Sequence, residues 1–136
     1  MAVCLGIDYG TKRIGLAWAD ELNIALPIGS IPGVNNLNLC LEALSAEIQR
    51  RGVDQIIIGY PVHMDGQIGK RAEEVDQFIG KLEQTFELPV HRVDERLTSL
   101  AARETIGGKS LRKGADKSGR VDAAAACLIL KDFLGS

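Results

Sequence analysis

Long apolar runs and cysteine pairs are both missing from this sequence of 136 residues. No apolar run approaches the roughly 20 residues of a membrane-spanning helix, and the N-terminus lacks the basic and apolar segments of a secretory signal. We therefore expect a cytoplasmic protein with no membrane partner. The three cysteines lie far apart among apolar neighbours and include no C-x-x-C pair, which indicates neither a disulfide framework nor a zinc site. Buried, reduced thiols are expected instead.

A strong excess of one charge is also missing, because 16 Lys and Arg residues face 18 Asp and Glu residues and leave a net charge of -2. The surface as a whole is therefore not expected to bind nucleic acid nonspecifically, so local charge must decide that question. Neither an internal repeat nor a linker is visible. With 46% hydrophobic and 25% charged residues, the chain fits one domain, residues 1–136.

Apolar patterning predicts an α/β fold. Three aliphatic runs, at residues 3–8, 13–19 and 24–31, predict the strands of an antiparallel meander, in which Pro27 places the third strand at an edge. Further buried strands are predicted at residues 54–61 and 88–95. Apolar residues at helical spacing predict helices over residues 37–48, 75–86, 97–106 and 121–134. This order of elements predicts a mixed five-stranded sheet with helices on both faces.

Acidic residues follow the first and last predicted strands. Asp8 ends the first strand, and Asp94 and Glu95 end the last. In open α/β sheets, sites form beyond the carboxyl ends of strands, so both groups are expected near one edge. Asp122 lies near the start of the final helix, where the four alanines that follow it would let the helix pack close to the sheet. The strand pattern does not choose between Asp94 and Glu95, because neighbouring residues point to opposite faces.

These carboxylates have two interpretations. Brought together, three negative groups would repel and raise one another's pKa unless a cation compensated them, and Mg2+ prefers such oxygen ligands. Taken singly, an Asp at a strand end or in a first helical turn is usually a turn former or a helix cap. The residues alone leave both interpretations open.

Clustered positive charge marks the segment that leads directly to Asp122. Residues 103–120 contain six basic and two acidic residues, on a chain that is acidic overall. This predicts a loop that binds phosphates, or else a solvated loop kept soluble by its charges. The basic residues are Arg103, Lys109, Arg112, Lys113, Lys117 and Arg120.

Other positions are also candidates for contact with nucleic acid. Lys70 and Arg71 open a helix, where free backbone N–H groups near Gly69 could receive a phosphate. Lys12 follows Asp8 by four residues and could steady a phosphate or a metal-bound water, or be a solvated turn lysine. Tyr60 could stack on an unpaired base, or be buried under the loop that follows it.

Four blocks of the sequence resemble the motif blocks of one family, YqgF, also called the Holliday junction resolvase-like (RuvX-type) or pre-16S rRNA nuclease family. In order, and over almost the whole chain, they are GIDYGTKRIGLAWAD, IIIGYPVHMDGQIGKRAEEV, LPVHRVDERLTSLAA and VDAAAACLIL. The resemblance implies a ribonuclease-H-like fold and phosphodiester hydrolysis by carboxylates at Asp8, Glu95 and Asp122, so it chooses Glu95 over Asp94. These three would bind Mg2+, or Mn2+ in its place, and two such ions about 4 Å apart activate water and neutralise phosphate charge. Lys12 is a secondary catalytic candidate.

The same resemblance implies a metal-dependent endonuclease that acts on structured nucleic acid. Processing of the 5′ end of pre-16S rRNA during ribosome biogenesis is the expected function. Two alternatives stay open: a Holliday junction resolvase that cuts four-way DNA, and a noncatalytic RNA-binding factor in ribosome assembly that would not need the acidic trio. The expected partner is therefore pre-rRNA or junction DNA, bound by a monomer or a homodimer.

Overall fold

The computed structural model describes residues 2–61, 69–94 and 120–135 of the chain. Its strands are β1 (Cys4–Asp8), β2 (Arg13–Ala19), β3 (Ala25–Pro32), β4 (Gln55–Tyr60) and β5 (Val90–Asp94). Its helices are a short 3-10 helix, η1 (Val34–Asn36), followed by α1 (Leu37–Arg51), α2 (Lys70–Phe86) and α4 (Arg120–Leu134). The helix predicted over residues 97–106 lies outside the described residues.

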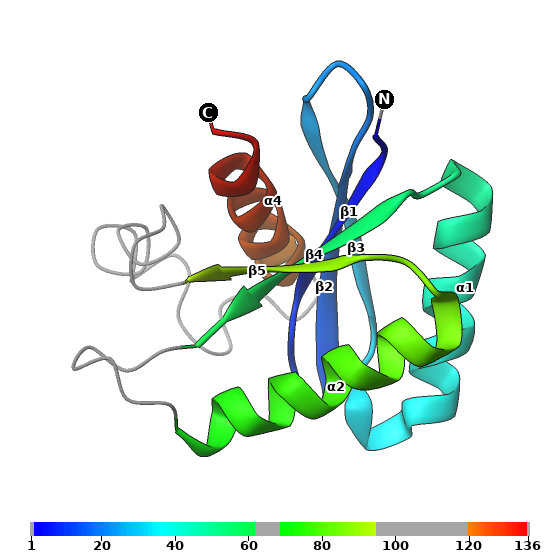
Figure 1. Cartoon of the computed structure of the whole chain (residues 1–136), viewed down its shortest axis with the longest axis vertical. Coiled ribbons are helices and arrows are strands. Elements are labelled where there is room, and N and C mark those ends of the chain that lie inside the picture. The colour runs from blue at the N-terminus through cyan, green and yellow to red at the C-terminus, as the bar shows by residue number, and fades with distance from the viewer. Residues whose placement is uncertain (1, 62–68, 95–119, 136) are drawn as a thin grey trace.

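The described strands form one mixed sheet in the order β3-β2-β1-β4-β5 (Figure 1). β1 pairs antiparallel with β2, and β2 with β3, whereas β1 pairs parallel with β4, and β4 with β5. The predicted meander, followed by two strands that alternate with helices, is therefore confirmed. β3, which contains Pro27, lies at an edge of the sheet as predicted.

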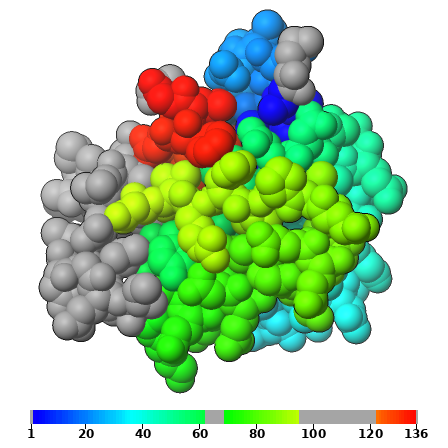
Figure 2. Space-filling model, in the orientation of Figure 1, coloured from blue at the N-terminus to red at the C-terminus, as the bar shows by residue number. Residues whose placement is uncertain are grey.

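The two faces of the sheet pack against different helices. On one face, Leu5 and Ile7 of β1 pack with Leu44 of α1 and Phe78 of α2. The other face packs against α4, which lies across the opposite side of the sheet in Figure 1. Figure 2 shows α2 and β5 together on the face toward the viewer, with α4 emerging above β5. Helices therefore cover both faces, and the hydrophobic core has one layer on each side of the sheet.

The alanine-rich start of α4 packs closely against the sheet, as expected. Ala123, Ala125 and Ala126 are buried. A Cβ on Gly6 of β1 would lie 3.0 Å from the carbonyl oxygen of Ala126 and 2.5 Å from Leu130 Cγ. Small side chains on both surfaces thus let the helix backbone approach the strand backbone, and the first turn of α4 can contribute to a site on the sheet.

Other predictions are confirmed with small changes. Helix α2 begins at Lys70 rather than at residue 75, because its first turn is polar and adds only Ala72 to the buried stripe. The cysteines are free and buried, and burial raises the pKa of the Cys40 thiol to about 11. In the described part of the chain, no helix is both long enough and apolar enough to span a membrane.

Candidate active site

Asp8 lies at the end of β1, on the face of the sheet that α4 covers. Gly6 faces α4, and residues two apart in a strand share a face. Asp8 is also directly opposite Gly15 of β2 in the antiparallel register, and opposite residues of such a pair lie on the same face. Asp8 and Gly15 therefore both face the side on which α4 begins.

Asp122 of α4 lies directly over Gly15. A Cβ on Gly15 would overlap the carbonyl carbon and oxygen of Asp122 and would lie 2.8 Å from Asp122 Cβ. Because optimal carbon–carbon contacts are about 3.5 to 4.0 Å, only glycine leaves room for the helix at this position. Since Gly15 is the register partner of Asp8, this packing brings together Asp8 and Asp122 from distant parts of the sequence. Two of the three predicted metal ligands are thus neighbours.

Asp122 has a cationic neighbour that was not predicted from the sequence. Arg13 Nε lies 3.0 Å from Asp122 Oδ2, in an ion pair whose side chains are 44% and 20% exposed, respectively. Oδ2 itself is buried, and among the described residues no donor, Arg13 included, is aligned to hydrogen bond with it. The guanidinium therefore compensates the charge without satisfying the oxygen. Strand alternation could have found Arg13, because it lies two residues before Gly15 on the same face.

The turn between β1 and β2 is fixed by backbone hydrogen bonds from the segment that follows β3. The N–H of Gly33 donates to the carbonyl oxygen of Lys12 at 2.9 Å, and the N–H of Asn35 donates to that of Thr11 at the same distance. The Lys12 side chain is exposed. Its backbone is thus held just beyond the end of β1, where Asp8 lies, while its role in chemistry stays a prediction.

Asp94 lies on the other face of the sheet. In the parallel register of β4 and β5, Asp94 is the partner of Tyr60, whose hydroxyl contacts α2. This position separates Asp94 from Asp8 and Asp122 and agrees with the choice of Glu95, which lies outside the described residues. Across residues 2–61, 69–94 and 120–135, no three His, Cys, Asp or Glu side chains are grouped closely enough to hold a metal ion.

Comparison with known proteins identifies the family. A sequence model described as "RuvX: Holliday junction resolvase" matches residues 2–136. The chain belongs to the RuvX family. It is 42% identical over 132 residues to the "Putative pre-16S rRNA nuclease" of Opitutus terrae, covering 96% of this chain and 90% of the relative. It is 40% identical over 135 residues to the protein of the same name from Geobacillus kaustophilus, covering 97% and 96%. These relationships place the RuvX-family chain among the nucleases, which are hydrolases.

Solved structures support the fold of the RuvX-family chain. It resembles Thermus thermophilus RuvC in complex with a Holliday junction substrate, with a TM-score of 0.57 and 13% identity over 100% of this chain and 98% of that one. It also resembles the yeast mitochondrial Holliday junction resolvase Ydc2, with a TM-score of 0.52 and 12% identity over 96% and 77% of the chains. At these identities the likeness shows the fold alone, which is the predicted ribonuclease-H-like α/β fold.

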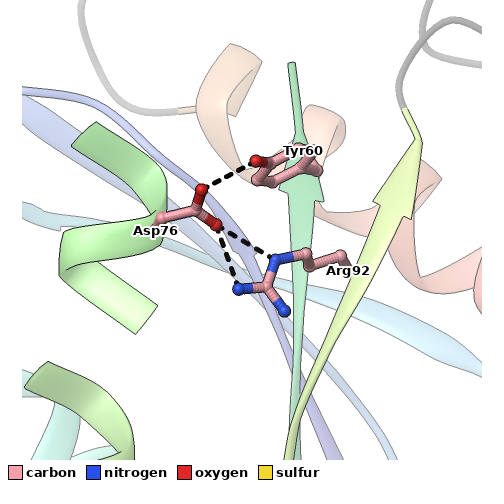
Figure 3. Close-up of polar contacts among 3 residues, drawn as sticks. All are labelled: Tyr60, Asp76 and Arg92. Atoms are coloured by element: carbon pink, nitrogen blue, oxygen red, sulfur yellow. Dashed lines mark hydrogen bonds and ion pairs between the residues drawn. The ribbon is translucent and has the colours of Figure 1, made fainter. Parts of the chain in front are cut away.

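A second polar cluster of the RuvX-family chain lies on the α2 face (Figure 3). The Tyr60 hydroxyl donates to Asp76 Oδ2 at 2.8 Å, and Arg92 Nη2 donates to Asp76 Oδ1 at 3.0 Å. The Arg92 guanidinium also lies 5.5 Å from the centre of the Tyr60 ring. Burial and the hydrogen bond to Asp76 both raise the pKa of Tyr60. Stacking of a base on Tyr60 stays a prediction, and such a base would have to share the ring with Arg92.

The predicted phosphate contacts at the start of α2 differ from each other. Lys70 is exposed at the first position of the helix, and its preceding residue, Gly69, provides no side-chain cap. Arg71 is turned toward the end of β1, because its Nη2 donates to the Tyr9 carbonyl oxygen at 3.0 Å and its guanidinium lies 4.8 Å from the Tyr9 ring centre. Arg71 thus links α2 to β1, which the charge pattern did not indicate.

The basic segment before α4 lies largely outside the described residues. Arg120 is the first residue of α4, but its side chain is not among those described. Phosphate binding by this segment therefore stays a prediction from the sequence. The remaining predicted contacts there are Lys109, Arg112, Lys113 and Lys117.

The acidic pair of the RuvX-family chain suits a hard divalent cation. Mg2+ is bound through oxygen ligands and commonly needs only one or two carboxylates, with water and substrate phosphate completing its shell. Asp8 and Asp122 supply carboxylates on one face, and Asp122 Oδ2 is a buried oxygen without an aligned hydrogen-bond donor among the described residues. The donor set therefore fits the expected cation.

Proposed function

We propose that this nuclease is a metal-dependent endonuclease in which Asp8 and Asp122 hold a divalent cation, with Glu95 as the third ligand. The observation that carries the proposal is the placement of Asp122 directly over Gly15, the register partner of Asp8. A carboxylate pair assembled from a strand end and a helix start, with a buried unsatisfied oxygen, has no evident structural use. Mg2+ is the proposed cation, with Mn2+ as a substitute.

The residues around the pair have complementary tasks. When bound, the cation would lower the pKa of the attacking water and neutralise charge on the phosphate. The turn that carries Lys12 is fixed by its backbone, so the exposed ammonium is available to a phosphate at this edge of the sheet. Lys70, at the uncapped start of α2, and the basic segment before α4 would bind the nucleic acid backbone at greater distance.

We propose RNA as the substrate, and the 5′ end of pre-16S rRNA as the cleavage site. Relatives that are 35% to 42% identical over at least 96% of this chain carry the name pre-16S rRNA nuclease. A four-way DNA junction is the second candidate, because the family is described as a Holliday junction resolvase and the similar RuvC structure is a complex with a Holliday junction substrate. The proposal treats residues 1–136 as one domain that acts in the cytoplasm as a monomer or a homodimer.

A paired cleavage assay tests this proposal. Wild type and Asp122→Asn, purified in parallel, are given either a pre-16S rRNA fragment or a four-way DNA junction, with and without Mg2+. We expect cleavage of the RNA that requires Mg2+ and is absent from Asp122→Asn. Preferential cleavage of the junction would transfer the assignment to a resolvase. Equal activity of Asp122→Asn and wild type would identify the activity as a contaminant, and RNA binding without any cleavage would support a noncatalytic role.

A further inference from the structure

Arg13 lies at the open end of the acidic pair. It is the first residue of β2, and it shares a face of the sheet with Gly15 two residues later. In the β1–β2 register, Gly15 is opposite Asp8, so Arg13 lies beyond this pair toward the turn. The arginine is therefore on the same face as Asp8 and Asp122 and nearer to the edge of the sheet.

The contact between Arg13 and Asp122 is close but incomplete. Nε lies 3.0 Å from Oδ2, yet the contact is not aligned as a hydrogen bond, so it is mainly an attraction between charges. The Arg13 side chain is about twice as exposed as that of Asp122. Asp122 is fixed by the backbone contact of its helix with Gly15, whereas the arginine has access to water. Of the two partners, Arg13 is the one that can move away.

We propose that Arg13 is a positioning residue that neutralises Asp122 in the metal-free protein and competes with the divalent cation for Asp122 Oδ2. A guanidinium and a metal ion cannot share one carboxylate oxygen without repelling each other. Binding of the cation therefore displaces Arg13, whose positive charge then lies at the edge where a substrate phosphate arrives. This inference rests on the proposed metal site at Asp8 and Asp122.

A purely structural role for Arg13 has the opposite consequence. If the ion pair only anchors the start of α4, its loss should loosen Asp122 and leave metal affinity unchanged or lower. If Arg13 competes with the cation, its loss should raise metal affinity even when the protein becomes less stable. The sign of the change in metal affinity separates the two roles.

The test is a calorimetric titration of the whole chain with Mn2+, without nucleic acid, for wild type, Arg13→Gln and Lys12→Gln. Lys12→Gln removes the same charge from the neighbouring residue, whose side chain is exposed. We expect Arg13→Gln to lower the Mn2+ dissociation constant about threefold to fivefold, the scale of one partly exposed ion pair. Lys12→Gln should change it less than Arg13→Gln does. Arg13→Met, which keeps the apolar stem, replaces Arg13→Gln if that variant does not fold.

Two results would overturn the proposal. An unchanged or weaker affinity in the Arg13 variant would assign Arg13 a structural role. An equal gain in Lys12→Gln would show that the general electrostatic field, and not the direct pair, sets the affinity. Failure of the metal site itself looks different, because wild type would then bind no Mn2+, or Asp122→Asn would bind it as tightly as wild type; either result would remove this inference with the site.

Discussion

Replacement of Gly15 by alanine tests how the site is assembled. The added methyl group would overlap the carbonyl group of Asp122 and lie 2.8 Å from its Cβ. Every obstacle belongs to Asp122 itself, at the start of a helix, and none is the far end of a flexible side chain. To restore ordinary contacts, the first turn of α4 must shift by about 1 Å or more. The carboxylate of Asp122 would move away from Asp8 with it.

The expected cost follows from this geometry. Overpacking of a well-packed core costs about 1 to 3 kcal/mol, and the rigid obstacle places Gly15→Ala near the upper end. Stiffening of the unfolded chain offsets about 0.4 to 1 kcal/mol of this, which leaves a net loss of roughly 2 kcal/mol in the free energy of unfolding. A displacement of about 1 Å in a catalytic group can lower the rate by about a hundredfold. We therefore expect a larger effect on cleavage than on stability.

Gly6→Ala is the matched control. It places the same methyl group on the same strand face against the same helix, but its nearest obstacle is the Leu130 side chain at 2.5 Å, with the Ala126 carbonyl oxygen at 3.0 Å. Chemical denaturation, Mn2+ titration and single-turnover cleavage are measured for both variants. Gly6→Ala should lose stability but keep metal affinity and the cleavage rate. If Gly15→Ala also keeps wild-type metal affinity and rate, Gly15 does not set the spacing of Asp8 and Asp122.

Two further outcomes are expected. Alanine at the four basic positions of the segment before α4 should flatten the salt dependence of RNA binding, by about 0.7 in the slope of log K against log salt for each lost phosphate contact on single-stranded RNA, whereas an unchanged slope would make the segment a solvated connector. These positions are Lys109, Arg112, Lys113 and Lys117. Burial raises the pKa of Cys40 from 9.0 to about 11, so the folded state holds this proton more tightly than the unfolded state, and the free energy of unfolding should fall as pH rises from 9 to 11. Denaturation across that range should show a smaller fall for Cys40→Ala, and equal falls would contradict the burial effect.

The sheet could be predicted because its signals are local. Aliphatic runs bounded by Gly10–Lys12 and by Pro32 and Gly33 mark the meander, and the alternation of the later strands with helices requires parallel pairing. The pairing of Asp8 with Asp122 was also accessible, because strand ends gather at one edge and the alanines after Asp122 allow close packing.

Contacts between distant segments could not be predicted in the same way. Gly15 looks like any glycine within a strand until α4 is placed on it, and the ion pair of Arg13 with Asp122 depends on the same docking. The charge pattern likewise placed Arg71 at a phosphate, whereas its guanidinium contacts Tyr9. Side-chain partners of this kind depend on packing between elements that are far apart in sequence, and local patterns carry little information about them.

The most direct test of the central claim is Mn2+ binding by carboxylate variants of the whole chain. Asp8→Asn and Asp122→Asn each remove one ligand charge with little change in shape, and Glu21→Gln removes the same charge at an exposed position in the turn before β3. We expect both Asn variants to fold, to bind Mn2+ at least tenfold more weakly than wild type and to lose metal-dependent cleavage, with Glu21→Gln unchanged. Wild-type Mn2+ affinity and cleavage in either Asn variant would contradict the claim that Asp8 and Asp122 together hold the catalytic cation.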